Sequence, residues 1–212
     1  MTLLEELPRG PSRERSIPVL ETKRLILRAP RLEDAKAVAV IANDRRIAEN
    51  TARIPHPYKV SDAEGFIAGA NCGAGEAVFL IALRDAIGPG KEHISGPIIG
   101  ACGVTLPENQ PPELGYWLGA PYWGKGFATE ALHAVIDYAF GAFDHAALHA
   151  GARVTNPASR RVLEKCGFQW TGVGLYRIRA ISSSAPIDRF RLERGIWSAI
   201  KDWGRGKVKK AI

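Results

Sequence analysis

The residues best placed to do chemistry lie in the stretch Tyr122-Trp123-Gly124-Lys125-Gly126-Phe127-Ala128-Thr129-Glu130. Two glycines flank a lysine, and apolar residues then recur at helical spacing from Leu132 to Phe143. A helix that begins here leaves its first backbone N–H groups without intrahelical partners, at the positive end of the helix dipole. The stretch therefore predicts either a phosphate-binding helix start or a plain glycine-rich turn before a surface helix.

Two familiar phosphate loops fit this stretch poorly. The run from Gly119 to Lys125 follows a P-loop, but Gly126 stands where a Ser or Thr would hold magnesium. Gly124-x-Gly126-x-x-Thr129 begins like a dinucleotide fingerprint, but its third small position is not glycine. Asp144 precedes the next predicted strand, where it cannot recognise a ribose. We favour neither loop.

Length and composition indicate an ordinary globular protein of one domain. The chain has 212 residues, of which 46% are hydrophobic and 24% charged. Its three cysteines, Cys72, Cys102 and Cys166, form no C-x-x-C pair, so we expect reduced thiols and a cytoplasmic location. The acidic N-terminus does not resemble a signal peptide, and no apolar run is long enough to span a membrane.

The charge balance narrows the class of partner. The net charge is +7, from 29 basic and 22 acidic residues, which favours an anionic partner such as a phosphorylated cofactor, or serves solubility alone. No aromatic–basic motif is present, so a nucleic-acid partner is not expected. His145 and His149 are four residues apart on a predicted strand, a spacing that forms no metal-binding face, and no metal is expected.

Periodicity and turn residues predict one mixed α/β domain over residues 19–212, after an extended N-terminal segment at 1–18. Strands are expected at 21–28, 76–83, 97–106, 113–118, 147–154, 170–180 and 187–194. Helices are expected at 34–46, 62–71, 126–142 and 197–203, the last continuing into a short basic tail. A further helix begins at Asn156, a favoured N-cap followed by proline, and ends before Gly167.

The order of these motifs resembles the GNAT N-acetyltransferases. A strand at 113–118 precedes the Gly-x-Gly-x-Ala bend and a long helix, and a strand at 147–154 precedes a helix that ends in Glu-Lys-Cys-Gly-Phe. Three runs look like the ribosomal-protein (RimJ/RimL-type) branch of this family. They are Gly-Tyr-Trp-Leu, Pro-Tyr-Trp-Gly-Lys-Gly-Phe-Ala-Thr-Glu-Ala and Asn-Pro-Ala-Ser-Arg-Arg-Val-Leu. The resemblance covers about residues 20–194. It implies a GNAT fold: a mixed, mostly antiparallel sheet of about seven strands flanked by helices.

The resemblance implies acetyl-CoA as co-substrate. Backbone amides of Gly124, Gly126 and Ala128 would bind its pyrophosphate, and the strand at 116–118 would run beside its pantetheine arm and polarise the acetyl carbonyl. Trp123 stands where many GNAT proteins carry Gln or Arg, an aromatic replacement that this branch often has. The expected coenzyme-binding residues are Tyr116, Trp117, Leu118, Trp123, Gly124, Lys125, Gly126, Phe127, Ala128, Thr129, Asn156 and Ser159.

The implied reaction is direct attack of a primary amine on the thioester. Because such an amine is mostly protonated at neutral pH, a base must accept its proton, and Glu113 holds the family's position for it, acting directly or through a water. Leu163 replaces the family's usual tyrosine acid, so Ser159 would protonate the departing thiolate. Outside the family context, Glu113 is a solvated carboxylate, and Ser159 and Asn156 are helix-capping residues. Cys166 lies on an apolar stripe and is expected to be a buried thiol.

Two functions remain open from the sequence. One is an N-acetyltransferase that acts on a protein N-terminus or a small amine in a ternary complex. The other is a non-catalytic module that senses acetyl-CoA or associates with the ribosome or RNA. Segments 47–60 and 180–187 should flank the acceptor site, but their composition names no acceptor. The family resemblance also admits a homodimer.

Overall fold

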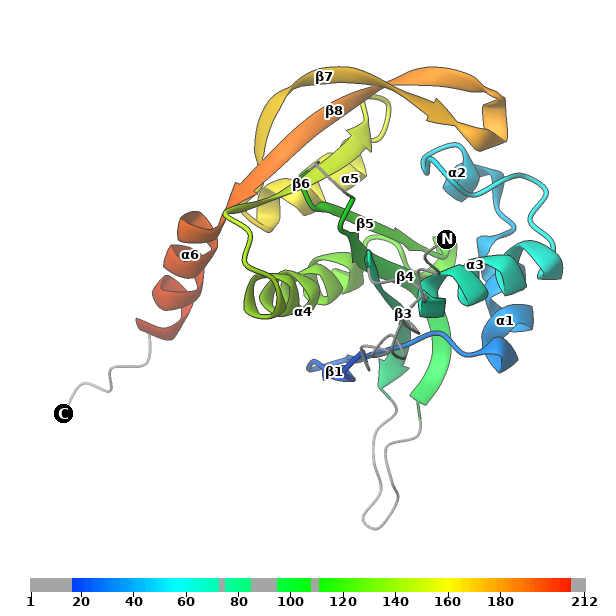
Figure 1. Ribbon diagram of the computed structural model, residues 1–212, viewed down its shortest axis with the longest axis horizontal. Helices are drawn as coiled ribbons and strands as arrows, with labels where there is room; N and C mark the ends of the chain where they lie inside the picture. The colour runs from blue at the N-terminus through cyan, green and yellow to red at the C-terminus, as the bar shows by residue number, and fades with distance from the viewer. Residues whose placement is uncertain (1–16, 73–74, 85–94, 108–110, 207–212) are drawn as a thin grey trace, which may run out of the picture.

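The computed structural model describes residues 17–72, 75–84, 95–107 and 111–206. The predicted N-terminal segment, apart from its last two residues, and the basic tail lie outside the described residues. Within the described ranges, eight strands form one sheet in the order β1-β2-β3-β4-β5-β6-β8-β7 (Figure 1). They are β1 (Leu20–Glu21), β2 (Leu25–Arg28), β3 (Glu76–Arg84), β4 (Ser95–Thr105), β5 (Glu113–Leu118), β6 (Ala147–Arg153), β7 (Gln169–Ile178) and β8 (Ser183–Glu193).

The described α-helices flank this sheet. They are α1 (Ala35–Ala42), α2 (Arg45–Ala48), α3 (Val60–Cys72), α4 (Phe127–Ala142), α5 (Pro157–Lys165) and α6 (Arg194–Gly206). Each described pair of neighbouring strands is antiparallel, except that β5 and β6 are parallel. The predicted mixed, mostly antiparallel fold is therefore confirmed. No helix of the described residues is long and apolar enough to cross a membrane.

Some element boundaries differ from those that the sequence predicts. The expected strand at 21–28 is two strands, because Thr22 Oγ1 accepts a hydrogen bond from Leu25 N–H at 3.0 Å and folds β1 back onto β2. The sheet therefore has eight described strands rather than about seven. The expected helix at 34–46 breaks at Asn43, whose side chain accepts from Tyr58 N–H instead, and Asp44 caps α2.

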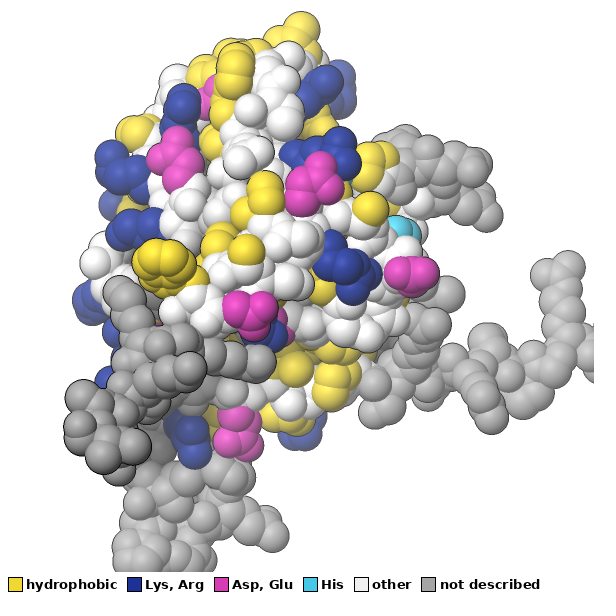
Figure 2. All heavy atoms as spheres, turned by 90° about the vertical axis from the view of Figure 1, so that its left-hand side faces the viewer, with side chains coloured by type: hydrophobic (Ala, Val, Ile, Leu, Met, Phe, Trp, Pro, Cys, Tyr) yellow, Lys and Arg dark blue, Asp and Glu magenta, His cyan; other side chains and the backbone are white. Residues whose placement is uncertain are grey.

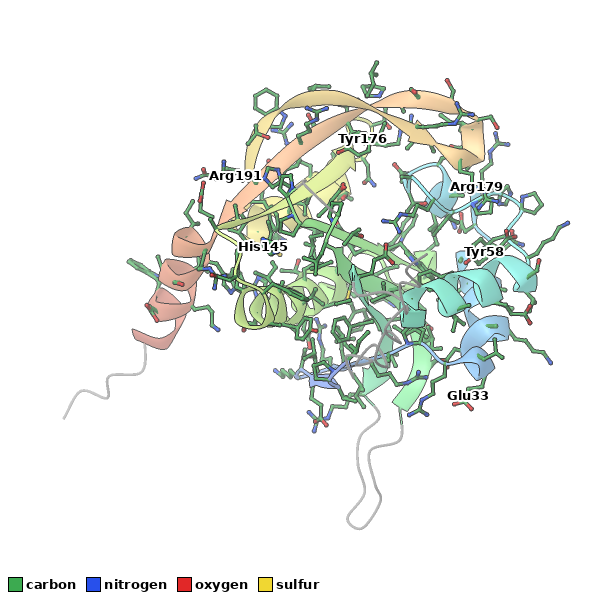
Figure 3. All side chains as sticks on the ribbon, viewed as in Figure 1. Glu33, Tyr58, His145, Tyr176, Arg179 and Arg191 are labelled. Atoms are coloured by element: carbon green, nitrogen blue, oxygen red, sulfur yellow. The ribbon has the colours of Figure 1, made fainter. Side chains whose placement is uncertain are left out.

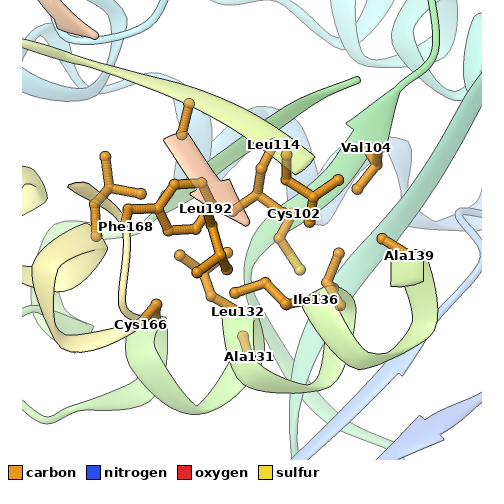
Figure 4. Packing of buried hydrophobic residues seen from close by; sticks show 14 of the residues in the cluster. Cys102, Val104, Leu114, Ala131, Leu132, Ile136, Ala139, Cys166, Phe168 and Leu192 are labelled. Atoms are coloured by element: carbon orange, nitrogen blue, oxygen red, sulfur yellow. The ribbon is translucent and has the colours of Figure 1, made fainter. Parts of the chain in front are cut away.

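Side chains of β5 pack into two apolar layers, one on each face of the sheet. On one face, Leu114 and Leu118 pack with Leu132 and Ile136 of α4 (Figure 4 shows Leu114, Leu132 and Ile136). On the other face, Trp117 packs against the buried layer formed with α1 and α3. Because side chains alternate along a strand, Glu113 shares the face of Trp117.

The β5–β6 pairing is short, and this shapes the site. Glu113 pairs with His149 and Leu114 with Ala150, and the His149 N–H donates to the Pro112 carbonyl at 2.8 Å. No further pair between these strands forms in the described part of the chain. From Gly115 onward, β5 therefore pairs only with β4, and its other edge keeps main-chain groups for a ligand.

Helix α5 has the ends that its sequence predicts. The Asn156 side chain accepts from the Ser159 N–H at 3.0 Å. At the other end, Gly167 has φ +87°, its N–H donates to the Glu164 carbonyl, and the Phe168 N–H donates to the Leu163 carbonyl. These two bonds form a Schellman motif, which fixes where α5 stops.

Candidate active site

The bend before α4 has the geometry of an anion site. Gly124 and Gly126 have φ of +72° and +78°, a region that favours glycine, and both are exposed. The first intrahelical bond of α4 runs from the Glu130 N–H to the Gly126 carbonyl. The N–H groups of the three residues between them therefore point out of the helix end, where the helix dipole is positive.

An ion pair between residues far apart in sequence holds this bend. The Arg24 Nε donates to Glu130 Oε2 at 2.7 Å, and Thr22 Oγ1 donates to Glu130 Oε1 at 2.7 Å. Arg24 Nη1 also donates to the Lys125 carbonyl at 3.0 Å, and its guanidinium lies 4.5 Å from the Phe127 ring centre. Burial raises the pKa of Glu130, but the hydrogen bonds from Thr22 and Arg24 outweigh it and lower that pKa. Sequence reasoning missed this contact, because nothing local indicates a partner 106 residues away.

The free edge of β5 carries main-chain groups of alternate residues. The Gly119 N–H donates to the Ile99 carbonyl at 2.8 Å, toward β4. Because the C=O and N–H of one peptide unit point in opposite directions, the Leu118 carbonyl points away from β4. It accepts a hydrogen bond from Trp123 Nε1 at 2.7 Å. By the same alternation, the main-chain groups of Tyr116 and Leu118 face the free edge, whereas those of Trp117 face β4.

Two hydroxyl groups meet beside this edge. The Tyr116 hydroxyl lies 2.8 Å from Ser159 Oγ and 3.3 Å from the Ser159 carbonyl oxygen. Burial raises the pKa of Tyr116 well above its usual range, so this phenol stays protonated. Sequence reasoning considered only the main chain of Tyr116 and therefore missed the pair. Leu163, at the position of the family's tyrosine, is fully buried in the α4 layer.

Glu113 lies on the opposite face of the same strand. Burial raises the pKa of its carboxyl group, and the positive charge of Arg53 partly offsets that effect. Arg53 is itself held by Glu76 Oε1, 2.6 Å from its Nη1, and by Thr105 Oγ1, 3.1 Å from its Nη2. Thr105 is the residue of β4 that pairs with Glu113. Strand register therefore fixes the distance between the carboxylate and the guanidinium.

A phenol and a guanidinium from the β7–β8 hairpin complete this face. Tyr176 of β7 lies under the arch of the hairpin (Figure 3). Burial raises the pKa of Tyr176, the charge of Glu113 raises it further, and the charge of Arg189 lowers it. Tyr176 therefore lies within electrostatic reach of both Glu113 and Arg189.

The two segments expected to flank an acceptor lie side by side. The Arg179 N–H, at the tip of the hairpin, donates to the Ala52 carbonyl at 3.1 Å. Arg153 Nη1, at the end of β6, donates to the Glu49 carbonyl at 2.9 Å. Figure 3 shows Arg179 at the hairpin tip, near Tyr58. These bonds tie the 49–52 segment to the hairpin tip and to the end of β6, the strand that pairs with β5 at Glu113.

Three further features, the Cys166 thiol, possible metal ligands and surface charge, do not form a second functional site among the described residues. Cys166 is fully buried, and burial raises the pKa of its thiol to about 12, which makes it a poor nucleophile. The prediction of a buried thiol there is confirmed. No group of three or more His, Cys, Asp or Glu in the described ranges could hold a metal ion. On the face seen in Figure 2, basic and acidic side chains are interspersed, so that face has no continuous basic patch for nucleic acid.

Residues 24–169 match the family described as "Acetyltransferase (GNAT) domain". The chain belongs to the GNAT acetyltransferases. An N-acetyltransferase of Bacillus licheniformis named p20, itself uncharacterized, is 31% identical over 159 residues, which cover 73% of this chain and 84% of p20. This family membership makes the protein an acetyltransferase with acetyl-CoA as co-substrate, and it favours the enzyme over the non-catalytic module.

Solved structures agree on the fold. RimJ of Mycobacterium smegmatis, in complex with CoA-disulfide, superposes with a TM-score of 0.70 at 19% identity, covering 91% of this chain and 96% of RimJ. A spermidine N-acetyltransferase of Vibrio cholerae, in complex with CoA and spermine, has a TM-score of 0.66 at 19% identity, covering 84% and 99%. The predicted resemblance to the GNAT family, with RimJ among its structural neighbours, is confirmed.

Proposed function

We propose that this acetyltransferase acts on a primary amine, either a protein N-terminus or a small amine, by direct attack within a ternary complex. One observation carries this proposal. Glu113 and the Tyr116–Ser159 pair project from opposite faces of β5, whose free edge runs toward the bend before α4. An acid and a base thus flank a single main-chain edge, as transfer between two bound substrates requires.

The coenzyme would lie along the bend and the free edge of β5. The amides of Gly124, Gly126, Phe127, Ala128 and Thr129 would hold the pyrophosphate, with Lys125 adding positive charge. Tyr116 and Leu118 would exchange main-chain hydrogen bonds with the pantetheine arm, and Trp117 would support the strand from the α1–α3 side. Trp123 would contact the arm beside the Leu118 carbonyl that it already binds. Asn156 would offer pantetheine its side-chain NH₂, because its oxygen is bound to Ser159.

Two proton transfers accompany the reaction, one to the Glu113 carboxylate and one from the Ser159 hydroxyl. Acetyl-CoA supplies the acetyl group as an activated thioester. Glu113 accepts the proton of the attacking amine, directly or through a water, and its raised pKa makes it a stronger base than an exposed carboxylate. As the new C–N bond forms and the C–S bond breaks, Ser159 Oγ donates a proton to the sulfur. The Tyr116 hydroxyl stays protonated and orients Ser159 Oγ, which regains its proton from water once the CoA thiol has formed.

Initial-rate kinetics test the proposal. Release of the CoA thiol is followed with a panel of N-terminal peptides and small amines, while both substrate concentrations are varied. We expect thiol release that depends on the amine, and intersecting double-reciprocal lines, because both substrates must be bound before transfer. Parallel lines would indicate an acetyl-enzyme, and no amine-dependent release would contradict the proposal.

We also infer one domain over residues 19–212 and a cytoplasmic location. The buried cysteines Cys102 and Cys166 are unpaired thiols, as reducing compartments favour. Limited proteolysis that cuts within 19–206 into separately folded halves, or cell fractionation that places the protein outside the cytoplasm, would contradict these two inferences.

A further inference from the structure

We propose that the acceptor amine carries a carboxylate, which Arg189 binds while the amine faces Glu113. This inference rests on the proposed function and adds the class of acceptor. The carboxylate belongs either to a free amino acid or to an acidic residue near a peptide N-terminus. The chemistry recognised is the same in both: an amine and an anion separated by a few bonds.

Strand register places Glu113 and Arg189 on one face. Glu113 of β5 is beside His149 of β6, and Gly151 of β6 pairs with Arg189 of β8. Phe190, next to Arg189 along β8, packs in the apolar layer under α4. Because side chains alternate along a strand, Arg189 projects from the opposite face, which is the face of Glu113. Neighbouring strands lie about 4.8 Å apart and each residue advances about 3.3 Å along a strand, so two strand steps and the two-residue offset from His149 to Gly151 separate the two Cα atoms by roughly 12 Å.

Small and apolar residues line the surface between these two side chains. Gly151 of β6 lies between them, and a Cβ there would come within 2.9 Å of Ile187 Cγ2 and 3.9 Å of Glu113 Oε1. The Arg189 guanidinium lies flat against β7 at Gly174, where a Cβ would overlap its Nη2, Nε and Cζ. The position of this guanidinium therefore depends on the absence of a side chain at residue 174.

The charge of Arg189 is not neutralised by the fold. Within the described ranges, the Arg189 side chain makes no hydrogen bond or ion pair, whereas Arg191, two residues on and on the same face, pairs with Glu193 at 2.8 Å. Arg53, whose charge lowers the pKa of Glu113, is paired with Glu76 at 2.6 Å. An anion supplied by the ligand would therefore meet an unpaired guanidinium, whose planar donors suit a carboxylate.

The same charges disfavour a polycationic acceptor. A polyamine would place a second ammonium group close to Arg189 or Arg53, where like charges repel. An amine with a nearby carboxylate matches both ends of the face, with its ammonium at Glu113 and its anion at Arg189.

Pairs of acceptors that differ by one carboxylate test the proposal. Phenylalanine is compared with phenethylamine, and the dipeptide Glu-Ala with Gln-Ala, in the full-length protein with acetyl-CoA. We expect kcat/KM to be about ten- to hundredfold higher for the carboxylated member of at least one pair. The pair that shows the difference identifies the source as a free amino acid or an acidic peptide. Spermidine should be acetylated more slowly than the preferred carboxylated acceptor.

Three variants locate the effect. Arg189→Gln should abolish the preference by raising KM for the carboxylated acceptor, with little change for its neutral partner. Arg191→Gln is the matched control and should keep the preference, because Arg191 is already paired with Glu193. Gly174→Ala keeps every charge but displaces the guanidinium, and it should weaken the preference as Arg189→Gln does. Thermal unfolding confirms that each variant is folded.

The outcomes separate this inference from the proposed function. Equal or better turnover of the neutral partners, or a preference that survives in Arg189→Gln, overturns the role of Arg189 while acetyl transfer stands. If no amine releases thiol, the proposed function fails, and calorimetry with the CoA-loaded protein decides the inference on its own. Carboxylated amines that bind more tightly than their neutral partners, in wild type but not in Arg189→Gln, support it, and equal binding overturns it.

Discussion

The Tyr116 hydroxyl lies 2.8 Å from Ser159 Oγ, so that a strand and a helix 43 residues apart share one hydrogen bond beside the free edge of β5. Tyr116 is largely shielded from water and stays protonated. When it donates to Ser159 Oγ, the Ser159 O–H is free to point at the coenzyme sulfur. Tyr116 therefore acts as a positioning residue for the serine.

A double-mutant cycle tests this pair. A thiolate is already a fair leaving group, so we expect Ser159→Ala to lower kcat by about a hundredfold, at the low end for acid–base catalysis. Tyr116→Phe should lower kcat by about tenfold, with KM for acetyl-CoA little changed. Because Tyr116 acts through Ser159, the double variant should be no slower than Ser159→Ala. Losses that multiply would show that the two hydroxyl groups act independently.

Arg53 should set the pH at which activity is lost on acidification. Glu113 must be ionised to act as a base; burial raises its pKa, and Arg53 lowers it. Removing that cation in Arg53→Met raises the pKa of Glu113 further. The acidic limb of the kcat/KM–pH profile should then move to higher pH. Arg45→Met, which removes the exposed partner of Glu49, should leave the limb in place, and a limb unmoved in Arg53→Met would contradict this electrostatic coupling.

The left-handed backbone at Gly126 predicts a cost in both stability and coenzyme binding. Alanine at φ +78° costs about 1–2 kcal/mol. Gly126→Ala should lower the unfolding free energy by that amount and raise the Kd for acetyl-CoA. Gly141→Ala near the end of the same helix meets no atom within 4 Å, and it should stabilise by up to about 1 kcal/mol. Urea unfolding and calorimetry give both quantities, and equal effects at the two glycines would refute the backbone argument.

Glu130 should matter for coenzyme affinity more than for stability. It holds Arg24, which in turn binds the Lys125 carbonyl in the bend. Glu130→Gln should raise the Kd for acetyl-CoA several-fold, because the bend loses its support. The unfolding free energy should fall by less than about 1 kcal/mol, since Arg24 is 43% exposed. Glu164→Gln, in the exposed pair with Arg160, is the control and should leave the Kd unchanged.

Local signals could be predicted from the sequence, and contacts between distant segments could not. The glycine bend, the Asn156 cap and the Gly167 stop each depend on neighbours within a few residues, and the structure has them as predicted. Strand β5 also has the predicted bounds, because prolines at 111–112 precede it and Pro121 follows it closely.

The remaining features depend on which strands meet and in what register. The Arg189 position over Gly174 arises from the β7–β8 pairing, and the Tyr116–Ser159 bond from the packing of α5 beside β5. Neither contact can be predicted from the residues that adjoin it in the sequence. The turn at Thr22 could not be predicted for a different reason. The β-forming residues on both sides of it have the pattern of one continuous strand.

The pH dependence of the Glu113→Gln variant tests the central claim most directly. In single turnovers with acetyl-CoA and a saturating amine, we expect the variant to be at least a hundredfold slower than wild type near neutral pH. Its Kd for acetyl-CoA should not change, and its rate should lose the acidic limb that ionisation of Glu113 produces. A variant that keeps the wild-type rate and the same acidic limb would contradict the assignment of Glu113 as the base.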